Sequence, residues 1–484
     1  MRLVYFASRC RDGLRLFVRL LASRAFLFAA LAWFCFQAVW MAVSTVGGIA
    51  PDEGAHTRTI QLYATTSISP LLSTQPEETF SLGAVTRSPS YFYHYVMSFP
   101  YRVLPAALSE ENKKIALRLI NILFPLSGLV VLYRAMMVLS APRAVAGLVV
   151  WMLSNTLMFV FLAGSVSYDN LEFFLSTLAF YYWAKLYRAS DGDAVRGNDV
   201  LKLGITMCAA SITKFTFLPL GATLILLLII RYRLQLSVVL RSCCVEYRSA
   251  RFSTSILAAV FLLFLALLIE RYGINYYRYG SYKPQCDQVL TYQQCLQSAL
   301  FSRNLQFRDK PVDRTIPGPD FVYRWFKRMK YGVYAIVGHR WTRCDPIITN
   351  GTAILFWSML LAVIATSRHR APLQLALVVI VGCYAATLLL HNYSLFVQSG
   401  HFGLALQGRY IFPVLGILYL VGVSALFQIS GKRDYLFGLC AVFIFALFMI
   451  SGLPRYIKTT SPEWHTSLMV GVNRGARELL ASVP

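Results

Sequence analysis

Charged residues are scarce in this sequence. Asp, Glu, Lys and Arg make up only 14% of its 484 residues, against about a quarter in soluble globular proteins. Hydrophobic residues make up 57%, and no stretch has the composition of a soluble domain of ordinary size. The sequence also lacks internal repeats and low-complexity segments, which excludes repeat architectures. Most of the chain is therefore expected to lie in a lipid bilayer.

Acidic residues are the scarcer of the two signs, because 22 Asp and Glu stand against 46 Lys and Arg. No basic stretch has the surroundings of a DNA-binding module, so nucleic acid is not an expected partner. Anionic lipid headgroups and membrane topology explain the net charge of +24 better. Membrane lipids are therefore expected partners.

A cleavable signal peptide is also lacking by this pattern. The first apolar stretch, Ala25 to Val46, is too long for such a peptide and leads to no small-residue cleavage site before Gly47. We interpret it as the first membrane span.

Apolar blocks predict an all-α polytopic membrane protein with about eleven spans of the ~20 residues that a bilayer requires. The expected spans are 24–46, 116–138, 144–163, 169–187, 200–213, 215–230, 252–270, 351–366, 372–390, 410–429 and 435–452. The blocks 200–213 and 215–230 are nearly continuous, so they are consistent with two spans or with one broken helix.

The arginines of the N-terminal segment set the expected orientation. Residues 1–24 form a basic segment that belongs in the cytoplasm. Counting forward puts each short basic connection in the cytoplasm, while the short outer connections 164–168 and 391–407 contain no Lys or Arg. The expected regions are a core at 25–270 with a first outer loop at 47–115, a larger outer loop at 271–350 between spans seven and eight, C-terminal helices at 351–452 and an outer tail at 453–484.

Both long outer loops have segments suited to a membrane surface. Ser88 to Leu104 is aromatic and contains two prolines, which favours short interfacial helices. Phe321 to Tyr334 has the composition of a basic amphipathic helix, which could lie on an anionic surface or cover the helical bundle. Cys286 and Cys295 share the second loop with Cys344, so a Cys286–Cys295 disulfide and three free thiols are both consistent with the sequence.

The main candidate for chemistry is Pro51-Asp52-Glu53-Gly54-Ala55-His56, directly after the first span. Proline and glycine indicate a turn in which the Asp52 and Glu53 carboxylates converge, one of them as a general base. The other carboxylate and His56 would position a substrate or a divalent cation. The alternative, compatible with the first, is a helix cap in which Asp52 and Glu53 satisfy free amide groups. Zinc is not expected, because one His without Cys is a poor ligand set.

The expected topology brings further polar residues to the same membrane face: Asp169 and Asn170, Lys214, and Arg409 with Tyr410. Lys214 and Arg409 have the chemistry to bind a phosphate. Each of these residues taken alone is more typical of an anchor at the end of a span than of a ligand-binding residue. The aromatic run that includes Tyr91 and His94 could stack on sugar rings, although a membrane-interface belt explains it better.

Several of these motifs together resemble a known family. They are the acidic motif at 51–56, Arg87-Ser88-Pro89-Ser90-Tyr91-Phe92-Tyr93, Tyr168-Asp169-Asn170, Lys214-Phe215 and Gln407-Gly408-Arg409-Tyr410-Ile411-Phe412-Pro413. In this combination the chain resembles the bacterial membrane proteins of domain of unknown function 2142, a family similar in turn to the GT-C glycosyltransferases. The resemblance covers roughly residues 25 to 450.

The resemblance implies a GT-C-like fold and a glycosyltransferase on the outer face of the bacterial cytoplasmic membrane. Such an enzyme moves a hexosyl or pentosyl group from a polyprenyl-phosphate donor to an envelope glycan, lipid or protein acceptor, with inversion. Asp52 would be the base and Glu53 its helper. The implied substrate-binding residues are His56, Arg87, Tyr91, His94, Asp169, Asn170, Lys214, Gln407, Arg409 and Tyr410. Arg87-Ser88-Pro89 stands where such proteins often have His-Pro-Pro, so that histidine's role falls to His94 or to no residue.

Two other classes of protein remain open. A transporter or flippase for lipid-linked saccharides would need ionisable residues at the midplane and broken helices in paired halves. The sequence has few such residues, since Glu172 and Arg118 lie near the outer ends of their spans. A non-catalytic scaffold of an envelope polysaccharide complex would use the loop 271–350 as its binding element.

Overall fold

The structure is a computed structural model that describes residues 2–189, 196–233, 251–309, 316–337, 340–341, 346–367, 371–431 and 433–482. Apart from the short antiparallel pair of β1 (Ile336–Val337) and β2 (Arg340–Trp341), its regular elements are helices. Those before residue 233 are α1 (Arg2–Leu21), α2 (Arg24–Ser44), α3 (Glu53–Thr66), η1 (Glu77–Leu82), η2 (Val85–Arg87), α4 (Phe92–Val103), α5 (Glu110–Asn121), α6 (Leu123–Val138), α7 (Arg143–Ser154), α8 (Leu157–Ala163), α9 (Tyr168–Ala189), α10 (Gly197–Thr213), η3 (Phe215–Phe217) and α11 (Leu218–Tyr232). Those after residue 250 are α13 (Arg251–Leu268), the π turn η4 (Ile269–Gly273), α14 (Ile274–Tyr279), α15 (Cys286–Val289), α16 (Tyr292–Leu296), α17 (Ala299–Asp309), α18 (Gly318–Tyr334), α19 (Pro346–Ala365), α20 (Pro372–Ser399), η6 (Gly408–Ile411), α21 (Phe412–Ser430), α22 (Asp434–Met449), α23 (Leu453–Thr459), η7 (Pro462–Trp464) and α24 (Ser467–Ser482).

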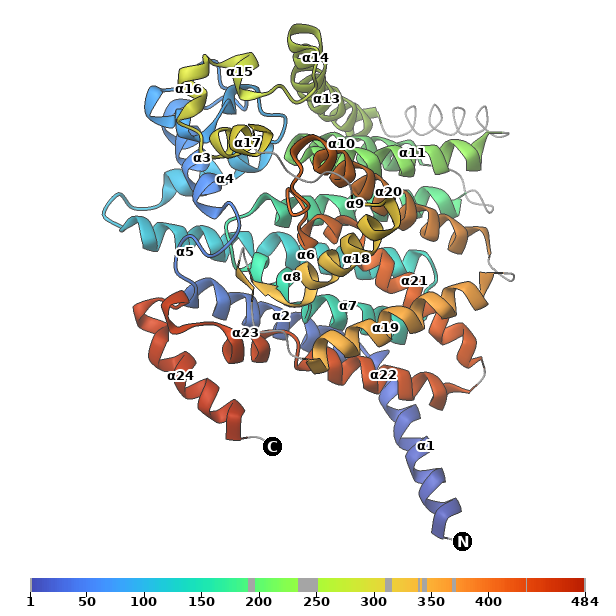
Figure 1. Cartoon of the computed structure of the whole chain (residues 1–484). Coiled ribbons are helices and arrows are strands. Elements are labelled where there is room, and N and C mark those ends of the chain that lie inside the picture. The colour runs from blue at the N-terminus through green and yellow to red at the C-terminus, as the bar shows by residue number, and fades with distance from the viewer. Residues whose placement is uncertain are drawn as a thin grey trace.

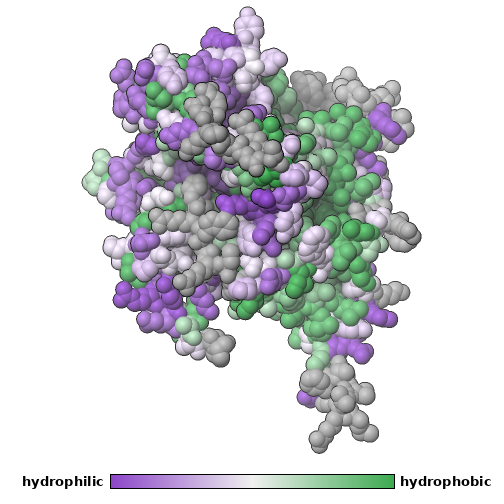
Figure 2. Space-filling model, viewed as in Figure 1, coloured by the Kyte–Doolittle hydropathy of each residue, from purple (hydrophilic) through white to green (hydrophobic). Residues whose placement is uncertain are grey.

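The long helices form a bundle with a polar side and an apolar side. In Figure 1, α3, α4 and α15 to α17 gather at the upper left and α24 lies at the lower left, while α1 projects at the lower right. Figure 2 shows hydrophilic residues over the left part of this face and hydrophobic residues over the right part. Large exposed side chains such as Ile229, Leu262 and Leu361 belong to the long helices. This distribution suits a bundle surrounded by lipid.

In the part of the chain that the structure describes, seven helical stretches are long and apolar enough to cross a membrane. Two bent pairs, α7 with α8 (68°) and α22 with α23 (40°), raise that count to as many as nine. The protein is therefore a multi-pass membrane protein, but the expected count of eleven is not confirmed. All eleven apolar blocks are helical, yet α10 has only 17 residues. The helix α9 is also not counted as a span, because it carries Asp169, Glu172 and Lys185, and it is largely enclosed by protein.

Lys214 separates the two blocks that the sequence left ambiguous. It ends α10 with an extended backbone (φ −157°, ψ 126°), and η3 begins at the next residue. The chain therefore forms two helices here. As a result, the Lys214 side chain leaves the backbone at a break between helices instead of from the side of a continuous one.

Gln37, in the middle of α2, holds the two bent pairs together. Its fully buried amide donates to the carbonyl oxygen of Ser154 (2.8 Å), and its Oε1 accepts from the amide of Leu453 (2.7 Å). Breaks in membrane helices leave backbone groups that a neighbour must satisfy, because lipid cannot. One polar side chain thus stabilises the breaks after α7 and after α22.

The helix expected at 321–334 is present as α18, and it covers the bundle. Phe321, Trp325 and Met329 are buried, and the Trp325 indole donates to Asn392 Oδ1 of α20 at 3.0 Å. This packing favours the covering role over a helix lying on an anionic surface. The segment expected to hold interfacial helices, 88–104, contains α4.

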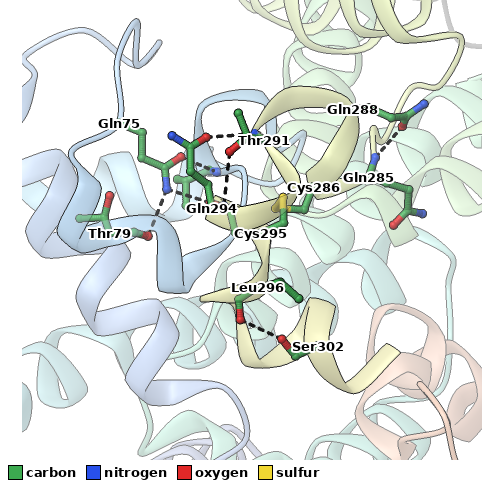
Figure 3. The surroundings of a disulfide bond; sticks show 12 residues. Gln75, Thr79, Gln285, Cys286, Gln288, Thr291, Gln294, Cys295, Leu296 and Ser302 are labelled. Atoms are coloured by element: carbon green, nitrogen blue, oxygen red, sulfur yellow. Dashed lines mark hydrogen bonds between the residues drawn. A yellow bond between two sulfur atoms is a disulfide. The ribbon is translucent and has the colours of Figure 1, made fainter. Parts of the chain in front are cut away.

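The segment that follows α14 contains a disulfide between Cys286 and Cys295, whose Cα atoms are 5.8 Å apart (Figure 3). It joins the short helices α15 and α16. Next to it, in the segment between α3 and α4, the Gln75 side chain donates to the carbonyl oxygens of Thr79 and Gly83. The remaining cysteine of this loop, Cys344, lies outside the described residues.

Candidate functional site

Asp52 has an unusual backbone conformation that turns its side chain toward η6. The residue lies directly before α3 with φ 60° and ψ 6°, the left-handed region that only Gly, Asn and Asp visit readily. Its side chain makes no capping hydrogen bond to α3. Instead Oδ2 accepts from Arg409 Nη2 at 2.5 Å, and the Asp52 side chain remains 48% exposed.

Glu53 points into a different, closed pair with Arg118 of α5. Two parallel hydrogen bonds of 2.7 and 2.6 Å join the groups, and the amide of Val166 donates to Glu53 Oε1 at 3.0 Å. Arg118 also donates to the carbonyl oxygens of Ala42 and Thr45. Both side chains are buried, so this pair ties the start of α3 to α2 and α5. The Asp52 and Glu53 carboxylates therefore do not converge.

Behind Asp52 lies a continuous line of ion pairs. Arg409 Nη1 is 3.2 Å from Asp169 Oδ2, and Lys214 Nζ is 2.5 Å from Asp169 Oδ1 and 2.8 Å from Glu172 Oε2. All four of these side chains are at most 2% exposed. Buried ions are tolerated only when paired. With Asp52, the cluster has three carboxylates and two cations, a formal charge of −1.

The members of this cluster come from several helix boundaries, with Asp169 and Glu172 both in the first turns of α9. Arg409 is in η6 directly before α21, Lys214 follows α10, and Asp169 begins α9. The rings of Tyr168 and Tyr410 lie 5.1 and 4.8 Å from Lys214 Nζ, within the range of cation–π attraction.

Glu172 and Tyr168 were not among the expected binding residues. Glu172 could have been found from sequence, because it follows Asp169 by three residues and so shares its helix face. Tyr168 belongs to the motif Tyr168-Asp169-Asn170, but only the fold shows that its ring lies against Lys214.

Two buried histidines, His56 and His94, lie near Asp52. His56 Nδ1 and His94 Nε2 are 2.9 Å apart, and the His56 ring lies 4.5 Å from that of Tyr168. His56 Nε2 and His94 Nδ1 are buried without a hydrogen-bond partner in the described part of the chain. Burial lowers the pKa of His56 to about 4 and that of His94 well below its usual value. Both rings are therefore neutral at pH 7.

The remaining expected residues lie at the edge of this cluster or outside it. The Asn170 amide donates to the carbonyl oxygens of Leu162 and Ser165, which fixes the turn into α9. Gln407 directly precedes η6, and its Oε1 is buried without a partner among the described residues. Arg87 pairs with Glu270 (2.8 Å), and the Tyr91 ring lies 4.7 Å from the Arg271 guanidinium, so these two belong to a second cluster.

The structure does not assemble the expected metal ligands. Glu53 is held by Arg118, so Asp52, Glu53 and His56 do not form a ligand set. More generally, no group of three or more His, Cys, Asp or Glu side chains within the described ranges is placed to hold a metal ion.

Fold and side chains together define a multi-pass helical membrane protein with a single half-exposed carboxylate at the edge of a buried line of ion pairs. Among solved structures, the chain is similar to the oligosaccharyltransferase of Archaeoglobus fulgidus in its apo form. That likeness has 12% identity and a TM-score of 0.47, and it covers 90% of this chain but 56% of the other, so this chain spans little more than half of that length. It is also similar to ArnT from Cupriavidus metallidurans in the apo state, with 14% identity, a TM-score of 0.45 and coverage of 94% of this chain and 73% of the other.

No protein-family model and no curated protein matches the chain. Membership of the domain of unknown function 2142 therefore stays a prediction. Likenesses at such low identity and TM-score do not establish an activity.

Proposed function

We propose that this protein is an integral membrane glycosyltransferase with Asp52 as its general base. One observation carries the proposal. Of the four carboxylates at the start of α3 and α9, Asp52 is 48% exposed, whereas Glu53, Asp169 and Glu172 are at most 2% exposed. A base must reach the proton that it removes, so only Asp52 can meet a substrate without rearrangement.

The proposed reaction is a single displacement at the anomeric carbon of a sugar linked to a polyprenyl phosphate. The acceptor hydroxyl oxygen bonds to that carbon and its proton passes to Asp52. The bond from the carbon to the phosphate oxygen breaks, and its electron pair leaves with the phosphate. The configuration at the anomeric carbon is inverted.

Arg409 is the group suited to the leaving phosphate. It already contacts Asp52, and its Nε is buried without a hydrogen-bond partner among the described residues. A phosphate that binds Arg409 would compete with Asp52 for the same guanidinium and leave the carboxylate free to accept a proton. Donor binding and activation of the base would then be one event.

Lys214 has a positioning role in this proposal, although its charge first suggested phosphate binding. Its ammonium lies between the buried carboxylates of Asp169 and Glu172, whereas Arg409 directly contacts the exposed Asp52. It holds Asp169 against Arg409, and it thereby sets the direction of the Arg409 guanidinium. Glu53 likewise holds the backbone of the Asp52 turn through Arg118.

The cellular setting is part of the same proposal. We place the site on the outer face of the bacterial cytoplasmic membrane, with α1 in the cytoplasm and an envelope glycan, lipid or protein as acceptor. The arginines of the N-terminal segment and the short basic connections support this orientation. The polar left side of Figure 2 holds α3 and α4, next to which Asp52 lies.

The decisive experiment replaces Asp52 with Asn in the full-length protein. Proteoliposomes would be supplied with a panel of polyprenyl-phosphate hexoses and pentoses, and transfer to envelope saccharides would be measured. Loss of a general base lowers the rate by about 100-fold to 10,000-fold. Full transfer by Asp52→Asn would reject the assignment. Glu77→Gln is the matched control, because Glu77 is an exposed carboxylate of the same outer segment.

A transporter would also have broken helices, and α7/α8 and α22/α23 are bent pairs. The break at Asn155 and Thr156 and the break at 450–452 contain no ionisable residue. The side-chain oxygen of Asn155 accepts hydrogen bonds from the Trp33 indole and the Gln37 amide. The bends thus have the packing of structural kinks and offer no site for a coupling ion.

A further inference from the structure

A polar cleft lies on the segments around η2 and α14, apart from the Asp52 cluster. It has a volume of about 410 Å³ and is formed by η2, η4, α14 and the stretch 71–73. Arg87, Glu270 and Arg278 contribute charge to its lining, while Leu72 and Tyr279 contribute apolar and aromatic surface. Ligand sites are typically about 300 to 1,000 Å³ and combine these kinds of lining. None of the lining residues belongs to the Asp52 cluster.

The cleft carries an excess of positive charge with donors left unused. Arg87 gives Nη1 to Glu270 and Nε to Asn275 Oδ1 (3.0 Å), and its buried Nη2 has no partner in the described part of the chain. Behind it, the fully buried Arg271 donates Nη1 to the carbonyl oxygen of Thr86, and its Nη2 is likewise unused. The lining itself holds two guanidinium groups, those of Arg87 and Arg278, and one carboxylate, that of Glu270, whereas Arg271 lies behind the lining with its Nε 3.3 Å from Glu270 Oε2. Unused buried donors are uncommon and favour an acceptor supplied by a ligand.

The same stretch of chain connects this cleft to the Asp52 cluster. Thr86 and Arg87 line the cleft, Ser90 Oγ accepts from the amide of Phe215 beside Lys214 (3.3 Å), and His94 contacts His56. Residues 86–94 thus join the cleft and the cluster along the chain, and only a ligand of several units in length would contact both. An oligosaccharide has such a length, and it also needs the hydroxyl and aromatic surfaces that Ser73 and Tyr279 supply.

We propose that this cleft binds an acidic sugar unit of the acceptor saccharide, one that carries a carboxylate such as a uronic acid. This inference rests on the proposed transferase function and adds the acceptor's chemical class. The planar carboxylate suits the parallel N–H groups of a guanidinium. The mixed lining favours a sugar acid over a bare phosphate, because a bare phosphate has no use for the tyrosine and leucine walls.

The test measures binding to the purified full-length protein by titration calorimetry without any donor. The probes are tetragalacturonate, neutral tetragalactose and inorganic phosphate. We expect tetragalacturonate to bind about tenfold more tightly than tetragalactose, as two or more charge-assisted hydrogen bonds would give, and to weaken with salt. Arg278→Gln should remove most of this preference. Arg278 is exposed, so the variant should fold normally.

Arg303→Gln is the matched control, since Arg303 is an exposed arginine of α17 outside the cleft. Equal affinity for the acidic and neutral probes, an equal effect of Arg303→Gln, or tight binding of phosphate alone would each overturn the inference. Asp52→Asn should bind tetragalacturonate unchanged. If the cleft does not bind acidic sugars, the calorimetric binding measurements will show it. If the proposed function is wrong, transfer will persist in Asp52→Asn.

Discussion

Asp52 and Glu53 are neighbours in sequence, yet they belong to two different arginine pairs. Glu53 and Arg118 are both buried and make parallel hydrogen bonds, with further bonds to the backbone. Asp52 Oδ2 accepts from Arg409 Nη2, and the Asp52 carboxylate remains half exposed. A closed pair can only stabilise the fold, whereas an open pair can exchange its partner for a ligand. The comparison therefore separates the buried, paired acid from the exposed one that we propose as the base.

Breaking the closed pair should have the largest effect. Arg118→Met leaves the Glu53 charge buried without a cation, and we expect the free energy of unfolding to fall by about 3–5 kcal/mol. The apparent melting temperature in detergent would measure this loss. The double variant Glu53→Gln/Arg118→Met should recover part of it, because no unpaired charge remains. A melting temperature of Arg118→Met equal to that of the unchanged protein would show that water reaches Glu53 and that the pair is not closed.

Acid should lower the stability of the protein through protonation of His56. Burial lowers the pKa of His56 from 6.5 to about 4, with Asp52, Arg409, Asp169 and Glu53 as the charged groups around it. Between these two pKa values, His56 therefore binds a proton in the unfolded chain but not in the folded protein. The contribution to stability is complete above about pH 6.5 and is lost as the pH falls toward 4, by roughly 3 kcal/mol.

The free energy of unfolding of the unchanged protein, compared between pH 7 and pH 5, should show about 2 kcal/mol of this loss. In His56→Gln the part of the pH dependence that belongs to His56 should disappear. A stability that stays constant between these two pH values would contradict a buried neutral His56.

Moving only the open pair should give a smaller loss of stability and a clear loss of activity. A Cβ atom at Gly332 of α18 would lie 2.5 Å from the backbone nitrogen of Gly408, next to Arg409. Gly332→Ala should therefore displace η6 and cost about 1–3 kcal/mol. Transfer activity should fall with it, as Arg409 shifts from Asp52.

Gly318→Ala on the same helix is its control, because a Cβ atom there meets no atom within 4 Å. An active, fully stable Gly332→Ala would show that η6 tolerates displacement.

Much of the architecture could be predicted from sequence. Each apolar block became a helix, because a bilayer requires backbone hydrogen bonds to be satisfied within the segment. The count of spans could not be predicted equally well. The helix α9 is polar enough to need protein around it, and only the packed structure shows that protein encloses it. Similarly, the break at Lys214 was ambiguous until α10 and η3 were seen as separate elements.

The candidate site was predicted in part. The shared membrane face of Asp52, Asp169, Lys214 and Arg409 followed from topology, and the structure joins these residues through ion pairs. The pairing partners could not be predicted, since Arg118 and Glu53 are 65 positions apart. The proposed role of Lys214 is positioning instead of phosphate binding, because its ammonium contacts two buried carboxylates.

The sequence by itself determined that this is a membrane protein with an acidic motif directly after its first span, since hydrophobicity and the order of residues are properties of the chain. Only the tertiary structure decided which of the two adjacent acids is exposed. The reason is the left-handed turn at Asp52, which directs successive side chains to different partners. Arg118 encloses one carboxylate, while Arg409 leaves the other open to solvent.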